Sequence, residues 1–349
     1  MNVFCDLHHG DLYYSLHLLF EERLKADLFR PIGVGWFEKG FWKIAEPYNN
    51  APDTINQFLG LPATWSTEVD PIQRYGEDRL IDGVYHIPAK VGSEYYIQKA
   101  ITFDKFLKTD IDVIVASHPG HYLPYAQLVR QYKPNAVYIK QIGNIAVRPE
   151  GNVLLAMNTP VPPNVNCLKY HPEAHKEYCY TSPANHSVIK SFIAAPLSEP
   201  NLTLFLEYEK LLPDFTFKMH GINGRDGVIS GDLMPQVMRD SAFVWHVKST
   251  GCGGFVARQA LACGRPCIIR KHYCHEHYTL TRDLFEDSVN CIDLDLGSTT
   301  ENVEKIRYFS EPLRHVEMCK NTADKFKRDV NFDAEAENVK AFLQRLQRK

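Results

Sequence analysis

One segment of this sequence, WHVKSTGCGGFVARQALACGRPCII over 245–269, has residue types and a spacing that suit phosphate binding. His246 and Lys248 end a predicted strand, and a predicted helix begins at Phe255. The turn between them contains three glycines, Gly251, Gly253 and Gly254. Glycines let backbone N–H groups approach an anion closely, and a helix N-terminus adds unpaired donors with a partial positive charge. Because Lys248 adds a full positive charge, the segment predicts a phosphate site.

The spacing of the turn is neither the GxGxxG of dinucleotide-binding proteins nor the GxxxxGK[ST] of P-loop enzymes. Instead the segment resembles a pattern in the second domain of GT-B glycosyltransferases of the large retaining (family 4-like) group. That pattern is a Gly-rich turn, then a helix with EA-x-A-x-G-x-P, then a strand. In that family the turn contacts the sugar and phosphates of the donor, and the Glu binds the ribose. Gln259 stands at the position of that Glu and Gly251 at that of an earlier Glu, so both paired acids are replaced. The donor-binding candidates that the resemblance implies in this segment are His246, Lys248, Gly251, Gly253, Gly254, Phe255 and Gln259.

The resemblance implies a glycosyltransferase that uses a nucleotide sugar, such as a UDP-sugar, as its donor substrate. It implies no cofactor and no metal, since a lysine and backbone donors replace a divalent cation at the departing diphosphate. The acceptor stays open among a glycan, a small molecule and a modified DNA base. Two other functions on the same fold stay open: a nucleotide-sugar epimerase-type enzyme, and a catalytically inactive nucleotide- or glycan-binding protein.

Histidines follow two strands predicted in the first half of the chain. His8 and His9 follow the strand at 2–5, and His118 follows the strand at 110–117. Histidine is the side chain best suited to exchange a proton near neutral pH, so these three are the candidate catalytic residues. His118 also resembles, in position, a GT-B histidine close to the transferred sugar. The alternative is that each is a loop or core residue with satisfied hydrogen bonds, and Asp6 is a residue that could orient an imidazole.

Two further loops offer donor-binding candidates. Arg225 lies in GINGRDG at 221–227, where GT-B proteins meet the nucleotide, and it could pair with a phosphate. Glu276 lies in RKHYCHEHY at 270–278, near the donor sugar in the resembling family. The latter loop also contains four potential zinc ligands, His272, Cys274, His275 and His277. They are crowded into six residues with no second spaced pair, so we expect no metal site.

Strands and helices alternate in two series, which predicts an α/β fold of two facing Rossmann-like domains with a cleft between them. The segment 147–187 holds six prolines and interrupts the series, so it contains the domain boundary. We predict an acceptor domain at 1–178, a nucleotide-sugar donor domain at 179–330, and a C-terminal helix at 331–349 that returns to the first domain. The Gly- and aromatic-rich stretch at 31–100 is predicted to be loops with short elements.

Bulk composition fits this prediction. The chain has 349 residues, 23% of them charged, and a formal net charge of −3, which is not the balance of a dedicated nucleic-acid binder. No apolar run is long enough for a membrane span, and charges interrupt the N-terminal segment where a signal peptide would be apolar. Nine cysteines without a secretion signal favour reduced thiols. We therefore expect a cytoplasmic protein.

Overall fold

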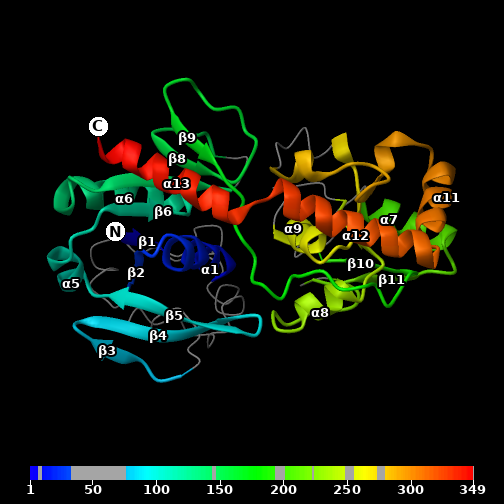
Figure 1. The fold of residues 1–349 in the computed structure, drawn as a ribbon, viewed down its shortest axis with the longest axis horizontal. Coiled ribbons are helices and arrows are strands. Elements are labelled where there is room, and N and C mark those ends of the chain that lie inside the picture. The colour runs from blue at the N-terminus through cyan, green and yellow to red at the C-terminus, as the bar shows by residue number, and fades with distance from the viewer. Residues whose placement is uncertain are drawn as a thin grey trace.

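The computed structural model describes residues 1–6, 10–32, 76–143, 147–192, 201–221, 224–247, 255–272 and 280–348. It confirms the predicted α/β class: a mixed, mostly parallel sheet and a fully parallel sheet, each with helices, form two Rossmann-like domains (Figure 1). We call the first sheet with its helices the N-domain, and the second sheet with its helices the C-domain.

In the described part of the chain, nine strands form the N-domain sheet in the order β3-β4-β5-β2-β1-β6-β7-β8-β9. They are β1 (Asn2–Cys5), β2 (Asp27–Pro31), β3 (Arg79–Ile81), β4 (Val84–Val91), β5 (Glu94–Ile101), β6 (Val113–Ala116), β7 (Val137–Ile142), β8 (Asn152–Leu155) and β9 (Asn166–Lys169). All neighbours from β5 to β9 are parallel, and β5-β2-β1-β6-β7-β8 has the 3-2-1-4-5-6 order of dinucleotide-binding folds. The order reverses between β1 and β6, so ligands are expected at the carboxyl ends of these two strands.

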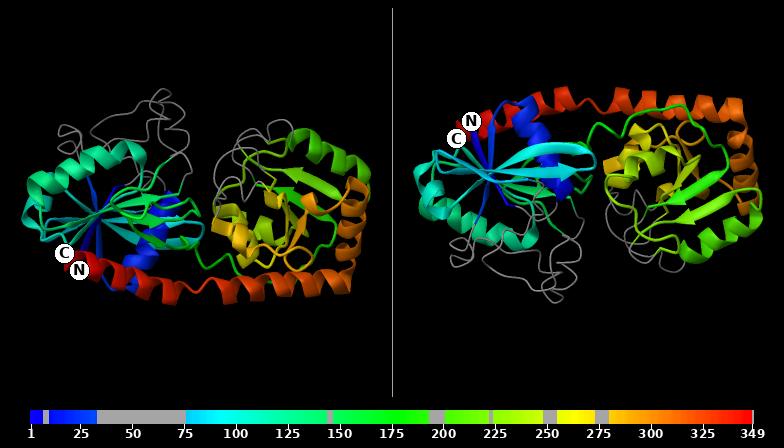
Figure 2. Two further views of the ribbon diagram at one scale, coloured as in Figure 1. Left: turned by 90° about the horizontal axis from the view of Figure 1, so that it is seen from above. Right: turned by 90° about the horizontal axis from the view of Figure 1, so that it is seen from below.

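The N-domain helices are α1 (Gly10–His17), which continues into a π-helical turn (Leu18–Arg23), α5 (Phe103–Lys108), α6 (Pro119–Tyr132) and α13 (Phe332–Gln347). Helix α6 covers one face of the sheet, whereas α1 and α13 cover the other (Figure 2). The last helix belongs to this core because Val339, Phe342 and Leu343 of α13 are buried in one cluster with Val3 and Phe4 of β1.

The sequence predicts loops with short elements over 31–100, but the described residues from 76 onward contain long strands. Strands β4 and β5 form an antiparallel hairpin of two eight-residue strands, with Tyr96 opposite Ala89 and Tyr95 opposite Lys90. Tyr96 is buried and Tyr95 is 66% exposed, which is the alternation expected of a sheet with one wet face. The alternation of buried and exposed side chains along these strands is hard to recognise in the sequence, because the surrounding segment is rich in Gly and aromatic residues.

Two other predicted boundaries are wrong for identifiable reasons. The residue pattern HPGHYLP at 118–124 predicts a loop after the strand at 110–117. It is instead the first part of α6, because the His118 side chain caps the helix and Pro119 takes the first helical position. The pattern at the end of the chain predicts two closing helices, at about 300–325 and 333–348. The structure has three helices there: α11 (Thr299–Ser310), α12 (Pro312–Asp329) and α13. Pro312 cannot continue α11 and begins α12 instead.

The C-domain sheet has five parallel strands among the described residues, in the order β11-β10-β12-β13-β14. Its strands and remaining helices are β10 (Val188–Ser191), α7 (Asn201–Leu211), β11 (Thr216–Met219), α8 (Met234–Arg239), β12 (Phe243–Trp245), α9 (Phe255–Ala262), β13 (Cys267–Ile269) and β14 (Cys291–Asp293), with 3-10 turns at Leu280–Leu284 and Leu294–Leu296. Side chains alternate between two cores: Phe243 and Trp245 face one, and Val244 faces the other. Helices on both faces explain why the central strands β12 and β13 are apolar throughout.

Two segments join the domains. Strand β9 ends at Lys169 and β10 begins at Val188, and the predicted boundary at 178 lies within this linker. The second connection is the junction of α12 with α13, which run along one side of both domains (Figure 2). Among the described residues, no helix is both long and apolar enough to cross a membrane.

Histidine 315 on α12 is expected to make the fold sensitive to acid. His315 is fully buried; its Nε2 lies 2.9 Å from the carbonyl oxygen of Ala242, and its Nδ1 lies 2.8 Å from Nδ1 of His186. Burial, together with the neighbouring His186 and Arg265, lowers the pKa of His315 to about 4. An unfolded chain binds this proton near pH 6.5, so the stabilisation is complete above that pH and is lost as pH falls toward 4. The difference corresponds to about 3 kcal/mol.

We expect His315→Gln to reduce the loss of unfolding free energy between pH 7 and pH 4.5, measured by urea denaturation, because glutamine can still donate to Ala242 without titrating. His86→Gln, at a half-buried histidine of β4, is the control for replacing a histidine by glutamine. Equal pH dependence in His315→Gln and the wild type would contradict this assignment.

Candidate active site

The carboxylate of Asp6, one residue beyond β1, is the centre of a buried polar cluster at the N-domain switch point. It accepts hydrogen bonds from the backbone N–H of Ser117 at 2.8 Å, from the Ser117 hydroxyl at 2.5 Å and from the backbone N–H of His118 at 3.2 Å. Its Oδ2 also lies 2.5 Å from Nδ1 of His121. Asp6 is 1% exposed, so these donors replace the water that a carboxylate needs. The carboxylate therefore fixes the turn from β6 into α6.

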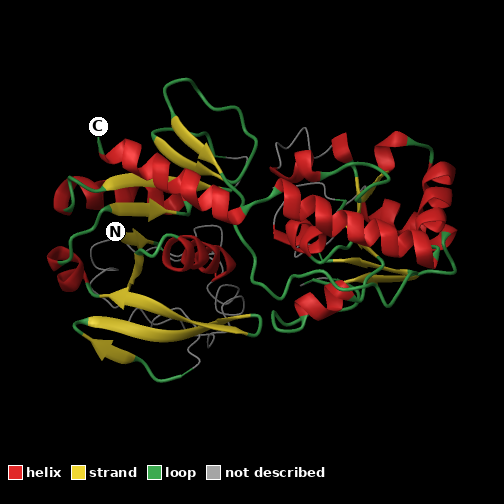
Figure 3. Ribbon diagram, in the orientation of Figure 1, coloured by secondary structure: helices red, strands yellow, loops and turns green. Residues whose placement is uncertain are grey.

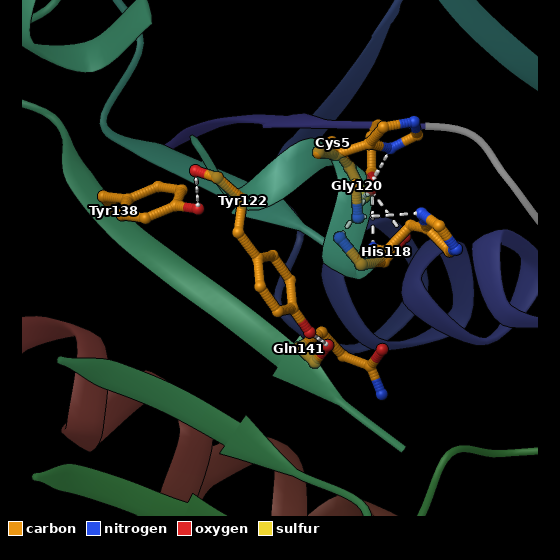
Figure 4. A network of polar contacts seen from close by, with 9 residues as sticks. Cys5, His118, Gly120, Tyr122, Tyr138 and Gln141 are labelled. Carbon is orange, nitrogen blue, oxygen red and sulfur yellow. Dashed lines mark hydrogen bonds and ion pairs between the residues drawn. The ribbon is translucent and has the colours of Figure 1, made fainter. Parts of the chain in front are cut away.

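His118 is held at the N-terminus of α6 by its own ring. Its Nδ1 accepts a hydrogen bond from the backbone N–H of Gly120 at 3.1 Å (Figure 4). An accepting Nδ1 carries no proton, so the neutral ring has its proton on Nε2, which is then a donor. A positive imidazolium is disfavoured at this end of a helix. The geometry therefore favours a neutral His118 that donates from Nε2, and the ring is half-buried.

His121 forms a buried pair with Asp6. Its side chain is 1% exposed, its ring stacks on Tyr125 at 5.8 Å between centroids, and it meets the His118 ring edge-on at 5.3 Å. Sequence reasoning named Asp6 as able to orient an imidazole, but 115 positions separate it from its actual partner. No local pattern links the two residues, although both follow parallel strands that pair directly.

Tyrosines flank this cluster on the side of β7. The Tyr122 hydroxyl donates to the carbonyl oxygen of Gln141 at 2.9 Å, and the Tyr138 hydroxyl donates to the carbonyl oxygen of Tyr122 at 2.7 Å (Figure 4). Burial raises the pKa of both phenols, with a further contribution from Asp6, so both stay protonated. Their hydrogen bonds hold α6 against the sheet.

The C-domain has its own switch point, between β10 and β12. The strand order corresponds to 2-1-3-4-5, which reverses between the first and third strands and places ligands at their carboxyl ends. Ser191 ends β10 and His246 follows β12, and both are buried. The Ser191 hydroxyl has no hydrogen-bond partner among the described residues. The predicted donor residue His246 thus lies where the topology predicts a ligand.

Helix α9 begins at Phe255, as predicted, beside this switch point. Gln259, which replaces the glutamate of the resembling family, lies on α9 and is 6% exposed. Arg258 was not singled out from the sequence. It is also buried, its guanidinium lies 4.9 Å from the Phe255 ring, and its charge acts on the phenol of Tyr170 in the N-domain core. The helix with the predicted donor residues therefore lies close enough to the N-domain core for the charge of Arg258 to act on Tyr170.

Arg225 has partners within its own domain. Its Nη1 donates to Oε2 of Glu209 at 2.9 Å and its Nη2 to the carbonyl oxygen of Phe217 at 2.7 Å. Oδ2 of Asp226, the next residue, lies 3.3 Å from Nε of Arg225. Burial alone would raise the pKa of Asp226, but hydrogen bonds from the Met219 backbone and the Lys218 side chain outweigh burial and lower it. A phosphate would have to compete with these carboxylates for Arg225.

The remaining predicted site residues lie outside the described residues: His8, His9, Lys248, Gly251, Gly253, Gly254 and Glu276. The same holds for three of the four residues considered as zinc ligands, Cys274, His275 and His277. Their roles stay predictions.

The N-domain switch point faces the C-domain. The arrowheads of β1 and β6, labelled in Figure 1, point toward the C-domain (Figure 3). Asn158, just after β8, donates to Oδ2 of Asp283 at 3.0 Å, and Lys90 of β4 pairs with Asp232 ahead of α8. Each contact joins one domain to a segment that follows a C-domain strand.

Solved glycosyltransferase structures have a similar fold. Anabaena Alr3699/HepE in complex with UDP is 12% identical, with a TM-score of 0.58 and 99% of each chain covered. S. aureus TarM, in complex with Fondaparinux, alpha-GlcNAc-glycerol and UDP, is 10% identical, with a TM-score of 0.57 over 98% of this chain and 99% of that one. An alpha-glucosyltransferase in complex with UDP and a 13-mer DNA containing an A:G mismatch is 11% identical, with a TM-score of 0.61 over 99% of this chain and 100% of that one.

The sequence itself matches no protein-family model and no curated protein. Similarity at these identities concerns the fold, and it extends over nearly the whole chain. The chain therefore has the two-domain GT-B fold of these glycosyltransferases.

Proposed function

We propose that this protein is a glycosyltransferase that moves a sugar from a UDP-sugar to an acceptor hydroxyl. The observation that carries the proposal is the Asp6 cluster at the N-domain switch point. This cluster holds His118 at the start of α6. The C-domain that faces it has the strand order of nucleotide-binding folds. The UDP in the structures of similar fold supports uridine as the nucleoside.

His118 would act as a neutral hydrogen-bond donor. Its Nε2–H would donate a hydrogen bond to a hydroxyl oxygen of the transferred sugar and hold that sugar in the geometry of transfer. As the bond from the anomeric carbon to the diphosphate breaks, negative charge develops on the diphosphate, where the donors of the C-domain would stabilise it. Asp6 and His121 are positioning residues in this scheme, because both are almost completely buried and would act through the turn that holds His118. His8 and His9 stay candidates from the sequence for the same edge of the sheet.

The C-domain would bind the donor. Lys248, the turn at 251–254 and the N-terminus of α9 would hold the diphosphate, with His246 and Gln259 contacting the phosphates and the ribose hydroxyls. Arg225 and Glu276 are the weaker members of this set. We propose that transfer needs no metal and no cofactor, because Lys248 and the backbone donors supply the positive potential. The acceptor class stays among glycans, small molecules and modified DNA.

Calorimetry against UDP, GDP, ADP, CMP and TDP tests the donor site. We expect selective binding of UDP that is lost in Lys248→Ala and unchanged by EDTA. Release of UDP from a UDP-sugar in the presence of a suitable acceptor would establish transfer. If a well-folded protein binds none of these nucleotides at millimolar concentration, the proposal fails. Tight binding without turnover on any acceptor would favour the non-catalytic alternative.

His118→Asn separates the catalytic role of this residue from its structural one. Asparagine is among the best N-cap residues, so α6 keeps its cap and the free energy of unfolding should change by less than about 0.5 kcal/mol. The Nε2 donor is lost, and we expect turnover to fall about 100-fold with little change in UDP affinity. Wild-type turnover in a stable His118→Asn protein would remove His118 from the mechanism.

A further inference from the structure

The β4–β5 hairpin extends from the N-domain sheet to the C-domain. The two strands are joined by Gly92 and Ser93, and their tip lies next to α8 of the C-domain (Figure 1). Gly92 has a φ of +61°, and a Cβ atom placed on it would lie 2.5 Å from Cε1 of His175 in the linker. Glu94 pairs with Lys176 of the linker at 3.0 Å. The hairpin tip therefore packs directly on the chain that joins the domains.

The linker is anchored on both sides of this contact. On the N-domain side, Glu173 pairs with Arg23 at 2.7 Å, and His171 lies 2.7 Å from Glu335 of α13. On the C-domain side, Arg239 donates to the carbonyl oxygen of Glu177. Residues 174–176 lie between these anchors, where the linker passes from one domain to the other: Ala174 packs against the C-domain core and the hairpin tip rests on His175, which is buried.

The second connection offers a matching bend. Between α12 and α13, Val330 and Asn331 adopt extended backbone conformations, with φ of −121° and −108°. Val330 is buried in the C-domain core, whereas α13 is buried in the N-domain core. Both connections between the domains therefore contain a short non-helical stretch. Such stretches between two rigid bodies are typical of a hinge.

One ion pair joins the hairpin to the C-domain directly. The ammonium of Lys90, on β4 near the tip, contacts the carboxylate of Asp232, two residues ahead of α8. Lys90 is 16% exposed and Asp232 is 51% exposed. Lys90 also lies over the ring of Tyr95 at 5.5 Å, which keeps the ammonium at the tip. The pair spans the hinge, so it exists only while the domains hold the arrangement described above.

We propose that the β4–β5 hairpin is a strut that sets the interdomain angle, and that Lys90 and Asp232 are positioning residues that hold the domains closed. The hairpin tip limits bending of the linker at His175, and the ion pair favours the closed arrangement over an open one. Sugar transfer requires the two switch points to approach each other, so the strut would act on turnover. Only this kinetic consequence rests on the proposed function.

Charge reversal tests the strut. Lys90→Glu and Asp232→Lys each replace attraction by repulsion, and for a half-exposed pair we expect the ratio of open to closed protein to rise about two- to fivefold. Small-angle X-ray scattering of the ligand-free protein should show a larger radius of gyration in each single variant and recovery in the double variant Lys90→Glu/Asp232→Lys. Lys140→Glu, which breaks a similarly exposed pair with Glu150 inside the N-domain, should leave the radius unchanged.

Kinetics provide the second measurement. Turnover should fall in the single variants and recover in the double variant, whereas UDP affinity stays constant because the predicted donor site lies in the C-domain alone. An unchanged radius of gyration in both single variants, or no recovery in the double variant, would overturn the proposal. Because the scattering measurement needs no ligand, it gives its answer even if the protein proves to bind no nucleotide.

Discussion

Asp6→Asn should unfold with a free energy about 3 kcal/mol below that of the wild type, since an amide cannot replace a buried carboxylate that accepts from four donors. The single oxygen of an amide has too few lone pairs to accept from Ser117, His118 and His121 together. The NH2 group of the asparagine would also face N–H donors that would then lack an acceptor. Urea denaturation at pH 7 measures the difference.

The matched control for this prediction is Asp112→Asn. Asp112 stands ahead of β6 at the opposite end of the same strands and accepts from the backbone N–H of Asn2 at 2.7 Å, in a partly buried position. An amide oxygen can take over this one bond, so we expect a cost below about 1 kcal/mol. If both substitutions cost the same, Asp6 is not the centre of the cluster. Turnover should also fall in Asp6→Asn, because the turn that carries His118 loses its anchor.

Much of the fold could be predicted because its strands are short apolar runs between helical patterns. DIDVIVAS and AFVWHVK contain β6 and β12, and each is buried on both faces as parallel strands are. The β4–β5 hairpin was missed because its signal is a period of two within a segment dominated by glycines and aromatic residues. The start of α6 was missed because a sequence containing His, Pro and Gly is typical of loops until the capping geometry is known.

The candidate site was predictable only in part. His118 could be named because it directly follows a strand, and the topology puts strand ends at one edge. The contact of Asp6 with His121 depends on β1 lying next to β6, a pairing between distant segments. Sequence patterns report local conformation and amphipathicity, whereas this pair depends on strand order.

The motif that indicated a donor site also contains a residue with a different role. In the stretch Gly264-Arg265-Pro266, the sequence predicts a break between helix and strand, and Gly264 does have a φ of +69°. A Cβ atom there would also lie 2.4 Å from the ring of Tyr180 in the linker. Arg265 next to it is fully buried and binds the same linker. The motif therefore also joins the linker to the C-domain.

Arg265→Lys should be among the most destabilising substitutions in the C-domain. The guanidinium of Arg265 donates to the carbonyl oxygens of Arg239 at 2.8 Å and of Thr181 and Cys263 at 2.9 Å each. Burial lowers the pKa of Arg265, but a guanidinium stays charged in a folded protein. Its planar set of N–H donors can satisfy several carbonyl oxygens at once. Lysine retains the charge but cannot reach these acceptors together, which leaves a buried ammonium and unpaired carbonyl oxygens.

We expect Arg265→Lys to lower the free energy of unfolding by about 3 kcal/mol or more, measured by urea denaturation. Arg314→Lys is the control. Arg314 is 41% exposed, pairs with Glu311 and lies over Tyr308, so its replacement should cost less than about 1 kcal/mol. Limited proteolysis should cut the linker near Thr181 faster in Arg265→Lys, because that segment loses its bonds to the C-domain. If Arg265→Lys is as stable as Arg314→Lys, the guanidinium network does not hold the linker, and the carbonyl oxygens of Thr181, Cys263 and Arg239 must be satisfied in another way.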